Sequence, residues 1–296
     1  MTASAKNGYV LVGVDYGPES VAAARWAVQA AHVRGRDLVI AHGIPMSFGT
    51  LPVSSEMIDQ MMAGGTGLVD EVMSRLVIPP DVTVETVVKP LPPVEVLRRL
   101  AETADFVVLG RHHQKLFERM AEGSVTSPLS AHAPRPVIVV PADHEQTAGY
   151  RKPVVVAVDG TTDAGSALEF GFDEAAQRQV ELIVLHGCPL GELTVAVQDD
   201  DVNLAEILAG WKADRPEVNV RTVILPGEAD EVIIKASGEA GLMVVARPHQ
   251  ERLGSWTRSV ARAVLRYACC PLVIVPPSPL PFANSRYRAH AAKEHV

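Results

Sequence analysis

The chain has 296 residues, of which 47% are hydrophobic and 21% charged, and its net charge is -8. This length exceeds the roughly 100–200 residues of one domain, so it predicts two domains with a core each. The acidic balance argues against nucleic acid or an anionic membrane as a partner, because both select basic surfaces. Residues 1–7 lack the apolar core of a signal peptide, and no apolar run is long enough to span a membrane, which predicts a cytoplasmic protein.

In chain order, the first half alternates short runs rich in valine and isoleucine with segments of helical periodicity. We expect strands near 9–15, 37–43, 82–88, 105–110 and 136–141, and helices near 18–34, 53–76, 92–103 and 123–132. Gly35 suits the exit of the first helix. The run Gly64-Gly65-Thr66-Gly67 predicts a break in the second helix, since each glycine there costs about 1 kcal/mol relative to alanine.

The second half repeats this plan. VLVGVD at 10–15 matches VVVAVDG at 154–160, which places Asp159 at Asp15 plus 144. LVIAHGIP at 38–45 matches LIVLHGCP at 182–189 at the same offset. The closing runs RPVIVVP at 135–141 and CPLVIVP at 270–276 match at an offset of 135. A period of this length indicates a duplicated domain rather than a solenoid.

Short apolar strands that alternate with helices indicate parallel strands buried on both faces. We therefore predict two tandem doubly wound α/β domains, at 8–142 and 152–277, each with its own five-stranded parallel sheet and helices on both faces, followed by a flexible tail at 278–296. The closing strands, Val137–Val140 and Leu272–Val275, are wholly apolar and lie at sheet edges. We expect them to pair, either in a homodimer or between the two domains.

Several side chains are predicted to be structural. The three cysteines, Cys188, Cys269 and Cys270, form no Cys-x-x-Cys pair and are expected to be buried core residues. His42 and His186 end the second strand of each repeat, where we expect them to serve packing. Trp26 and Trp211 fall in helical periodicity and are expected in the core.

In a doubly wound fold, ligands bind beyond the carboxyl ends of the strands. Asp15 ends the first strand there, where its carboxylate either accepts from a ligand or caps the following helix. Gly110 ends the fourth strand, and Gly123-Ser124 precedes the last helix. A glycine beside a helix start lets backbone N–H groups approach a phosphate, although an isolated Gly-Ser pair also simply starts a helix.

Together these segments resemble the universal stress protein domain, twice over. The features that carry the resemblance are a strand ending in VD, a strand ending in HG, a G-x-H loop, a GSVT helix start and a VIVVP strand. The resemblance implies a Rossmann-like fold of the adenine nucleotide alpha hydrolase type. It also implies a nucleotide site in the first domain at Val14, Asp15, Gly43, Leu109, Gly110, His112, His113, Gly123, Ser124, Val125 and Thr126.

The glycine pattern of nucleotide-binding members is incomplete here. His113 stands where the family has its second glycine, and the second domain carries Ala246, His249 and Arg258 at the three glycine positions. We therefore expect the first domain to bind ATP or a relative weakly, with or without Mg²⁺, and the second to bind no nucleotide.

Two functions remain open at this stage. One is a stress-response regulator that binds a nucleotide and associates with an unidentified protein partner. The other is a nucleotide-free interaction scaffold. We expect no enzymatic activity, because the chain has no Walker A pattern, no Ser-Gly-Gly pyrophosphatase loop and no nucleophile with a plausible partner.

Overall fold

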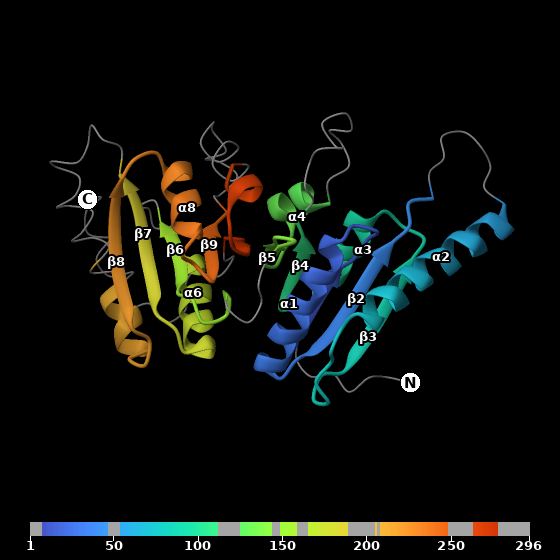
Figure 1. Cartoon of the computed structure of the whole chain (residues 1–296), viewed down its shortest axis with the longest axis horizontal. Coiled ribbons are helices and arrows are strands. Elements are labelled where there is room, and N and C mark those ends of the chain that lie inside the picture. Colours follow the sequence, from blue (N-terminus) through green and yellow to red (C-terminus); the bar gives the residue numbers. More distant parts are fainter. Residues whose placement is uncertain are drawn as a thin grey trace, which may run out of the picture.

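The computed structural model describes residues 8–46, 54–111, 125–143, 149–158, 165–188, 205, 208–247 and 263–277. These residues form two α/β halves that lie side by side (Figure 1). The first half contains β1 (Tyr9–Gly13), α1 (Glu19–Arg34), β2 (Asp37–Gly43), α2 (Ser55–Ser74), β3 (Val84–Lys89), α3 (Pro93–Leu100), β4 (Phe106–Gly110), α4 (Thr126–His132) and β5 (Val137–Val140). The second contains β6 (Val154–Val158), α6 (Gly165–Arg178), β7 (Leu182–Cys188), β8 (Val220–Pro226), α8 (Ala229–Ser237), β9 (Leu242–Ala246) and β10 (Leu272–Val275).

The strands form one sheet in the order β3-β2-β1-β4-β5-β10-β9-β6-β7-β8. Within each half every pair of neighbouring strands is parallel, as predicted. The halves meet where β5 and β10 pair antiparallel, with Val273 opposite Ile138. The expectation of two separate sheets is therefore wrong, while the predicted pairing of the closing strands between the domains is confirmed. Each of these two short, apolar strands would be an exposed sheet edge in a single half, and their pairing covers both edges.

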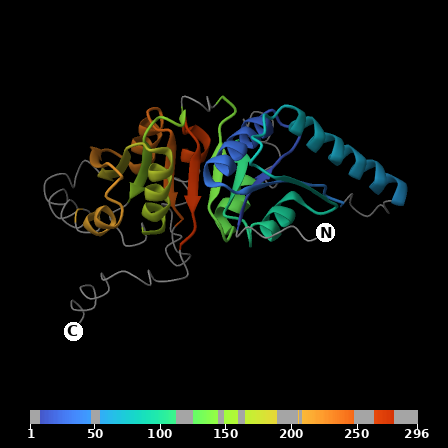
Figure 2. The ribbon, with the colours of Figure 1, turned by 90° about the horizontal axis from the view of Figure 1, so that it is seen from below.

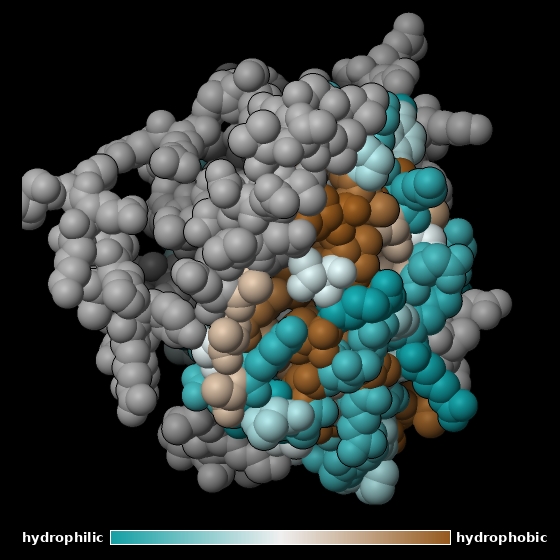
Figure 3. All heavy atoms as spheres, turned by 90° about the vertical axis from the view of Figure 1, so that its left-hand side faces the viewer, coloured by the Kyte–Doolittle hydropathy of each residue, from teal (hydrophilic) through white to brown (hydrophobic). Residues whose placement is uncertain are grey.

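Because β5 and β10 each have a neighbour on both sides, they occupy the middle of the sheet. A homodimer through these strands stays a prediction, and it would require them to exchange partners. The outer strands of the sheet are β3 and β8. Figure 3 faces the β8 end, where hydrophobic patches are bordered by hydrophilic groups. Arg221 of β8 forms an ion pair with Glu181.

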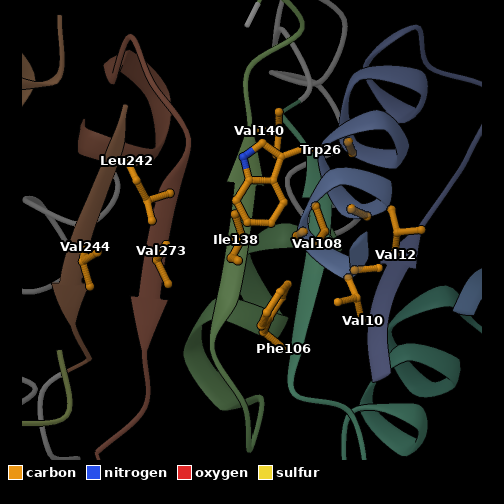
Figure 4. Packing of buried hydrophobic residues seen from close by; sticks show 14 of the residues in the cluster. Val10, Val12, Trp26, Phe106, Val108, Ile138, Val140, Leu242, Val244 and Val273 are labelled. Carbon is orange, nitrogen blue, oxygen red and sulfur yellow. The ribbon is translucent and has the colours of Figure 1, made fainter. Parts of the chain in front are cut away.

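Helices cover both faces of the sheet, and α2 extends past it at one end (Figure 2). On one face, α1, α2 and α6 cover a single hydrophobic cluster that runs through both halves. In Figure 4, Trp26 of α1 lies over β4 and β5, and Val273 and Leu242 of the second half line the same layer. On the opposite face, each half has its own cluster under α3 and α4 or under α8. None of the helices in the described ranges combines the length and hydrophobicity needed to cross a membrane.

Helix α2 is unbroken from Ser55 to Ser74, so the predicted break at its glycine run is wrong. The reason is tertiary packing. An ideal Cβ placed on Gly65 would lie 2.6 Å from Ile44 Cδ1 and 3.1 Å from His42 Cδ2. Gly65 thus lets α2 approach the end of β2 closely, and this contact outweighs the low helix propensity of glycine.

Two arginines at equivalent repeat positions cross the junction reciprocally. Arg247, directly after β9, donates from Nη1 to the carbonyl oxygen of Ala133 at 2.9 Å. Arg111, directly after β4, donates from Nη1 to the carbonyl oxygen of Ala268. The two arginines are 136 residues apart and the two alanines 135 apart, so the duplicated halves make one contact twice, as in a two-fold symmetric interface. Burial lowers the pKa of both guanidinium groups.

A second junction cluster lies on the face of α1 and α6. Glu174 of α6 forms ion pairs with Arg34 of α1 and with Arg178 of its own helix, the latter at 2.9 Å. The Arg178 guanidinium also stacks 4.2 Å above the ring centroid of Tyr150. Burial lowers the pKa of Arg34 to about 10. Arg34 and Arg178 are repeat equivalents, 144 residues apart, and Glu174 balances the charge where two buried cations meet.

The other structural expectations hold with two differences. Cys188, Cys270 and Trp26 are buried, and Trp211 is partly buried and stacks on Phe172 with a centroid distance of 5.6 Å. Cys269, however, is exposed. It lies with the buried Cys270 in the bend that precedes β10.

Candidate functional site in the first half

The turn between β1 and α1 is held by the side chain of Asp15. Its Oδ1 accepts from the backbone N–H of Gly17 at 2.9 Å and from the hydroxyl of Ser20 at 2.8 Å. The Ser20 Oγ in turn accepts from the backbone N–H of Asp15 at 2.8 Å. The Asp15 side chain thus closes the turn ahead of α1, whose N-cap residue Pro18 has no side-chain cap hydrogen bond, so Asp15 does not cap the helix as one prediction held. Acceptance from a ligand stays a prediction, and the turn fixes a carboxylate at the carboxyl end of β1.

The histidines that end β2 and β7 are packing residues, as expected. His42 Nδ1 lies 2.8 Å from the carbonyl oxygen of Val14, and His186 Nδ1 lies 3.1 Å from that of Val158. Both side chains are buried. Because the ring nitrogen facing a carbonyl has to donate, each histidine ties the end of the second strand to the end of the first.

Gly43 and Gly110 sit where the backbone of another element comes close. A Cβ on Gly43 would lie 2.6 Å from Pro93 Cα and 2.8 Å from the carbonyl oxygen of Leu91. A Cβ on Gly110 would lie 2.7 Å from Glu19 Cβ and 2.8 Å from the Glu19 carbonyl oxygen. Both glycines therefore let α3 and α1 start against the strand ends, whether or not a ligand is present.

A cleft of about 160 Å³ lies at these strand ends. Seven predicted site residues line it: Val14, Asp15, Gly43, Leu109, Gly110, Val125 and Thr126. The other four, His112, His113, Gly123 and Ser124, lie outside the described residues. The volume is below the roughly 300–1,000 Å³ typical of sites for drug-sized ligands.

Sequence reasoning missed part of this lining. The cleft is also bounded by Gly13, Ser20, Ala41, His42, Pro93 and Leu97. Ser20 was accessible to prediction because it lies one helical turn after the Asp15 turn, where a hydroxyl can bond back to it. Pro93 and Leu97 come from α3, and no local motif marks that helix as a wall of the site.

The described part of the second half keeps some of these features. His186 and Gly187 lie at the end of β7 just before its last residue, Cys188, while His42 and Gly43 are the last two residues of β2. A Cβ on Gly187 would lie 3.4 Å from Ala229 Cα, which is ordinary contact, so α8 stands farther from its strand than α3 does. Among the described residues, no three His, Cys, Asp or Glu side chains come together as a metal site in either half.

The arrangement defines a tandem doubly wound α/β protein whose first half has a cleft at the carboxyl edge of its sheet. The chain belongs to the universal stress protein family, whose family model matches residues 7–141 and 151–276.

Relatives share this tandem organisation. A universal stress protein from Mycobacterium tuberculosis H37Rv is 29% identical over 93% of this chain and 99% of its own length. The crystal structure of a universal stress protein from Archaeoglobus fulgidus superposes with a TM-score of 0.72 at 18% identity, covering 92% of this chain and 97% of that one. A universal stress protein of Archaeoglobus fulgidus solved in complex with dAMP is 28% identical, with a TM-score of 0.33, and covers 43% of this chain and 98% of its own.

Proposed function

We propose that this protein is a non-enzymatic regulator of the stress response and that its first half binds an adenine nucleotide weakly. The observation that carries the proposal is the convergence of seven predicted residues on one cleft. They come from four separate parts of the chain: the ends of β1, β2 and β4 and the start of α4. The parallel sheet brings these strand ends to one edge, which is where doubly wound folds bind their ligands.

The chemistry of the lining suits a nucleotide. Asp15 is held at the end of β1 as a hydrogen-bond acceptor for a sugar hydroxyl or an amino group. Val14, Leu109 and Val125 offer apolar surface for a base or a sugar. Thr126 adds a hydroxyl on the side of Gly110, where the family resemblance expects the phosphate. The small cleft favours a mononucleotide as the ligand to test first, with ATP and Mg²⁺ as the second.

The alternative, a nucleotide-free scaffold, is favoured by one observation. Gly43 and Gly110 are explained by backbone packing alone, since a Cβ on either would come within 2.8 Å of a neighbouring main chain. If these glycines serve only the fold, the cleft is a by-product of how α1 and α3 begin. In that case the protein acts through its surface.

One experiment separates the two functions. The purified full-length chain is denatured, any released nucleotide is identified by mass spectrometry, and the native chain is titrated with dAMP and ATP by calorimetry. Thr126→Trp fills the cleft, and Ser127→Trp places the same bulk on the exposed neighbouring residue, which does not line it. We expect Thr126→Trp alone to weaken binding by about tenfold or more, equivalent to about 1.4 kcal/mol.

If both variants weakened nucleotide binding equally, the nucleotide would bind outside this cleft. No released nucleotide and no heat at millimolar nucleotide would favour the scaffold.

A further inference from the structure

Tyr16 follows the cleft residue Asp15 in the turn after β1, and its side chain is exposed without being part of the cleft lining. Its relative exposure is 76%, which is unusual for a ring of this size beside a hydrophobic core. Its backbone lies inside the turn closed by the hydrogen bond from Gly17 to Asp15, so the position of the ring is set by an ordered segment. A large apolar surface therefore faces solvent next to a ligand-sized cleft.

The Tyr16 ring contacts the ring of His42, which lines the cleft. The two ring centroids are 6.0 Å apart and the rings are nearly perpendicular, at 86°. His42 lines the cleft and is fixed by its contact with the Val14 carbonyl. On the other side, the Tyr16 hydroxyl reaches toward α2, since a Cβ on Gly64 would lie 3.9 Å from it. The ring thus lies between His42, which lines the cleft, and the Gly64 position of α2.

We propose that Tyr16 is a positioning residue that stacks on the base of the nucleotide bound in the first half. This inference rests on the function proposed above and adds a specificity element to it. Removal of an aromatic side chain that stacks on a base weakens binding by about tenfold or more. An exposed ring gains from such contact because the base covers apolar surface that otherwise stays in water.

The repeat supplies an internal comparison. The residue that corresponds to Tyr16 in the second half is Gly160, which has no side chain to stack. A base-stacking wall is therefore available in the first half alone. This asymmetry agrees with the asymmetry of the glycine pattern, yet it concerns the base end of the ligand rather than its phosphate end.

The test compares wild type, Tyr16→Ala and Tyr16→Phe as full-length chains. Each is titrated by calorimetry with dAMP and with ribose 5-phosphate, which lacks the base. We expect Tyr16→Ala to weaken dAMP about tenfold and Tyr16→Phe to bind within about twofold of wild type. Ribose 5-phosphate should bind all three chains equally, because stacking involves the base alone. Thermal unfolding of the three chains checks that the fold is unchanged.

The outcomes distinguish this inference from the proposed function. If wild type binds dAMP and Tyr16→Ala binds it equally well, the stacking role is wrong and the nucleotide site stands. If Tyr16→Phe loses as much as Tyr16→Ala, the hydroxyl acts rather than the ring, and the stacking role is again wrong. If wild type binds no nucleotide, both proposals fall.

Discussion

Arg34 of α1 and Glu174 of α6 form an ion pair across the junction of the two halves, and the Glu174 side chain is only 1% exposed. Glu174 also pairs with the buried Arg178. One carboxylate therefore stands between two buried guanidinium groups that the duplication brings together. Ala30 occupies the repeat position equivalent to Glu174, so the first half has no carboxylate to replace it.

Replacing Glu174 should destabilise the whole protein. Glu174→Gln leaves two buried cations without their anion, and breaking a buried pair in this way costs about 3–5 kcal/mol. The control is Glu71→Gln, which removes an exposed ion pair with Arg75 and should cost under about 1 kcal/mol. Denaturant unfolding of the two variants measures both. Similar losses would mean that the junction pair contributes no more than a surface pair.

Arg111 and Arg247 should stabilise the junction between the two halves on the face of the sheet opposite Glu174. Arg247→Ala leaves the Ala133 carbonyl without its donor, which we expect to cost about 1–3 kcal/mol. Arg111→Ala should behave alike because it removes the equivalent bond to Ala268. The control is Arg135→Ala, since exposed Arg135 bonds a carbonyl of its own half, that of Glu102.

Amide hydrogen exchange measures where in the structure the arginine substitutions lower stability. Amides of β5 and β10 should exchange faster in Arg111→Ala and Arg247→Ala than in Arg135→Ala. Unchanged exchange at both strands would show that β-pairing alone holds the junction.

Much of this fold could be predicted from the sequence. Runs such as VLVGVD at 10–15 are both apolar and short, and this pattern leaves few alternatives to a buried parallel strand. The helix break at the glycine run was predicted wrongly because helix propensity is local. The contact between Gly65 and Ile44 joins residues that only the tertiary fold brings together. Likewise, the pairing of β5 with β10 was expected, but its consequence, one continuous sheet, was not drawn.

The site was predictable where a residue lies at a strand end and not where it lies on a helix wall. Asp15 and Gly110 follow directly from the strand pattern. Pro93 and Leu97 line the same cleft because α3 packs closely on Gly43, which no spacing along the chain reveals.

The glycines of α2 should respond differently to alanine. Nothing lies within 4 Å of a Cβ on Gly67, so Gly67→Ala should stabilise the protein by about 0.5–1 kcal/mol. Gly65→Ala should destabilise it, because its Cβ would meet Ile44, His42 and Val88 within 3.1 Å. Thermal or denaturant unfolding compares the pair. A gain in stability from both variants would mean that α2 can move away from β2 at little cost.

Stability should also fall in alkali because of Cys270. Burial raises the pKa of its thiol from 9.0 to about 12. The folded state therefore keeps a proton that the unfolded chain loses, so the stabilisation is complete below pH 9 and is lost as the pH rises toward 12. Wild type should lose stability more steeply than Cys270→Ala between pH 9 and 11, by at most about 1.4 kcal/mol per pH unit. Parallel curves for the two chains would contradict the shift.

The central claim is that the first half binds an adenine mononucleotide at the carboxyl edge of its sheet. The most direct measurement is a titration of the isotope-labelled full-length chain with dAMP, followed by the amide NMR signals of both halves. We predict that the signals of Val14, Asp15, Gly110 and Thr126 shift and saturate together, while those of Val158 and Ala246 at the equivalent strand ends stay in place. Saturating shifts confined to the second half, or no shifts at millimolar dAMP, would contradict the claim.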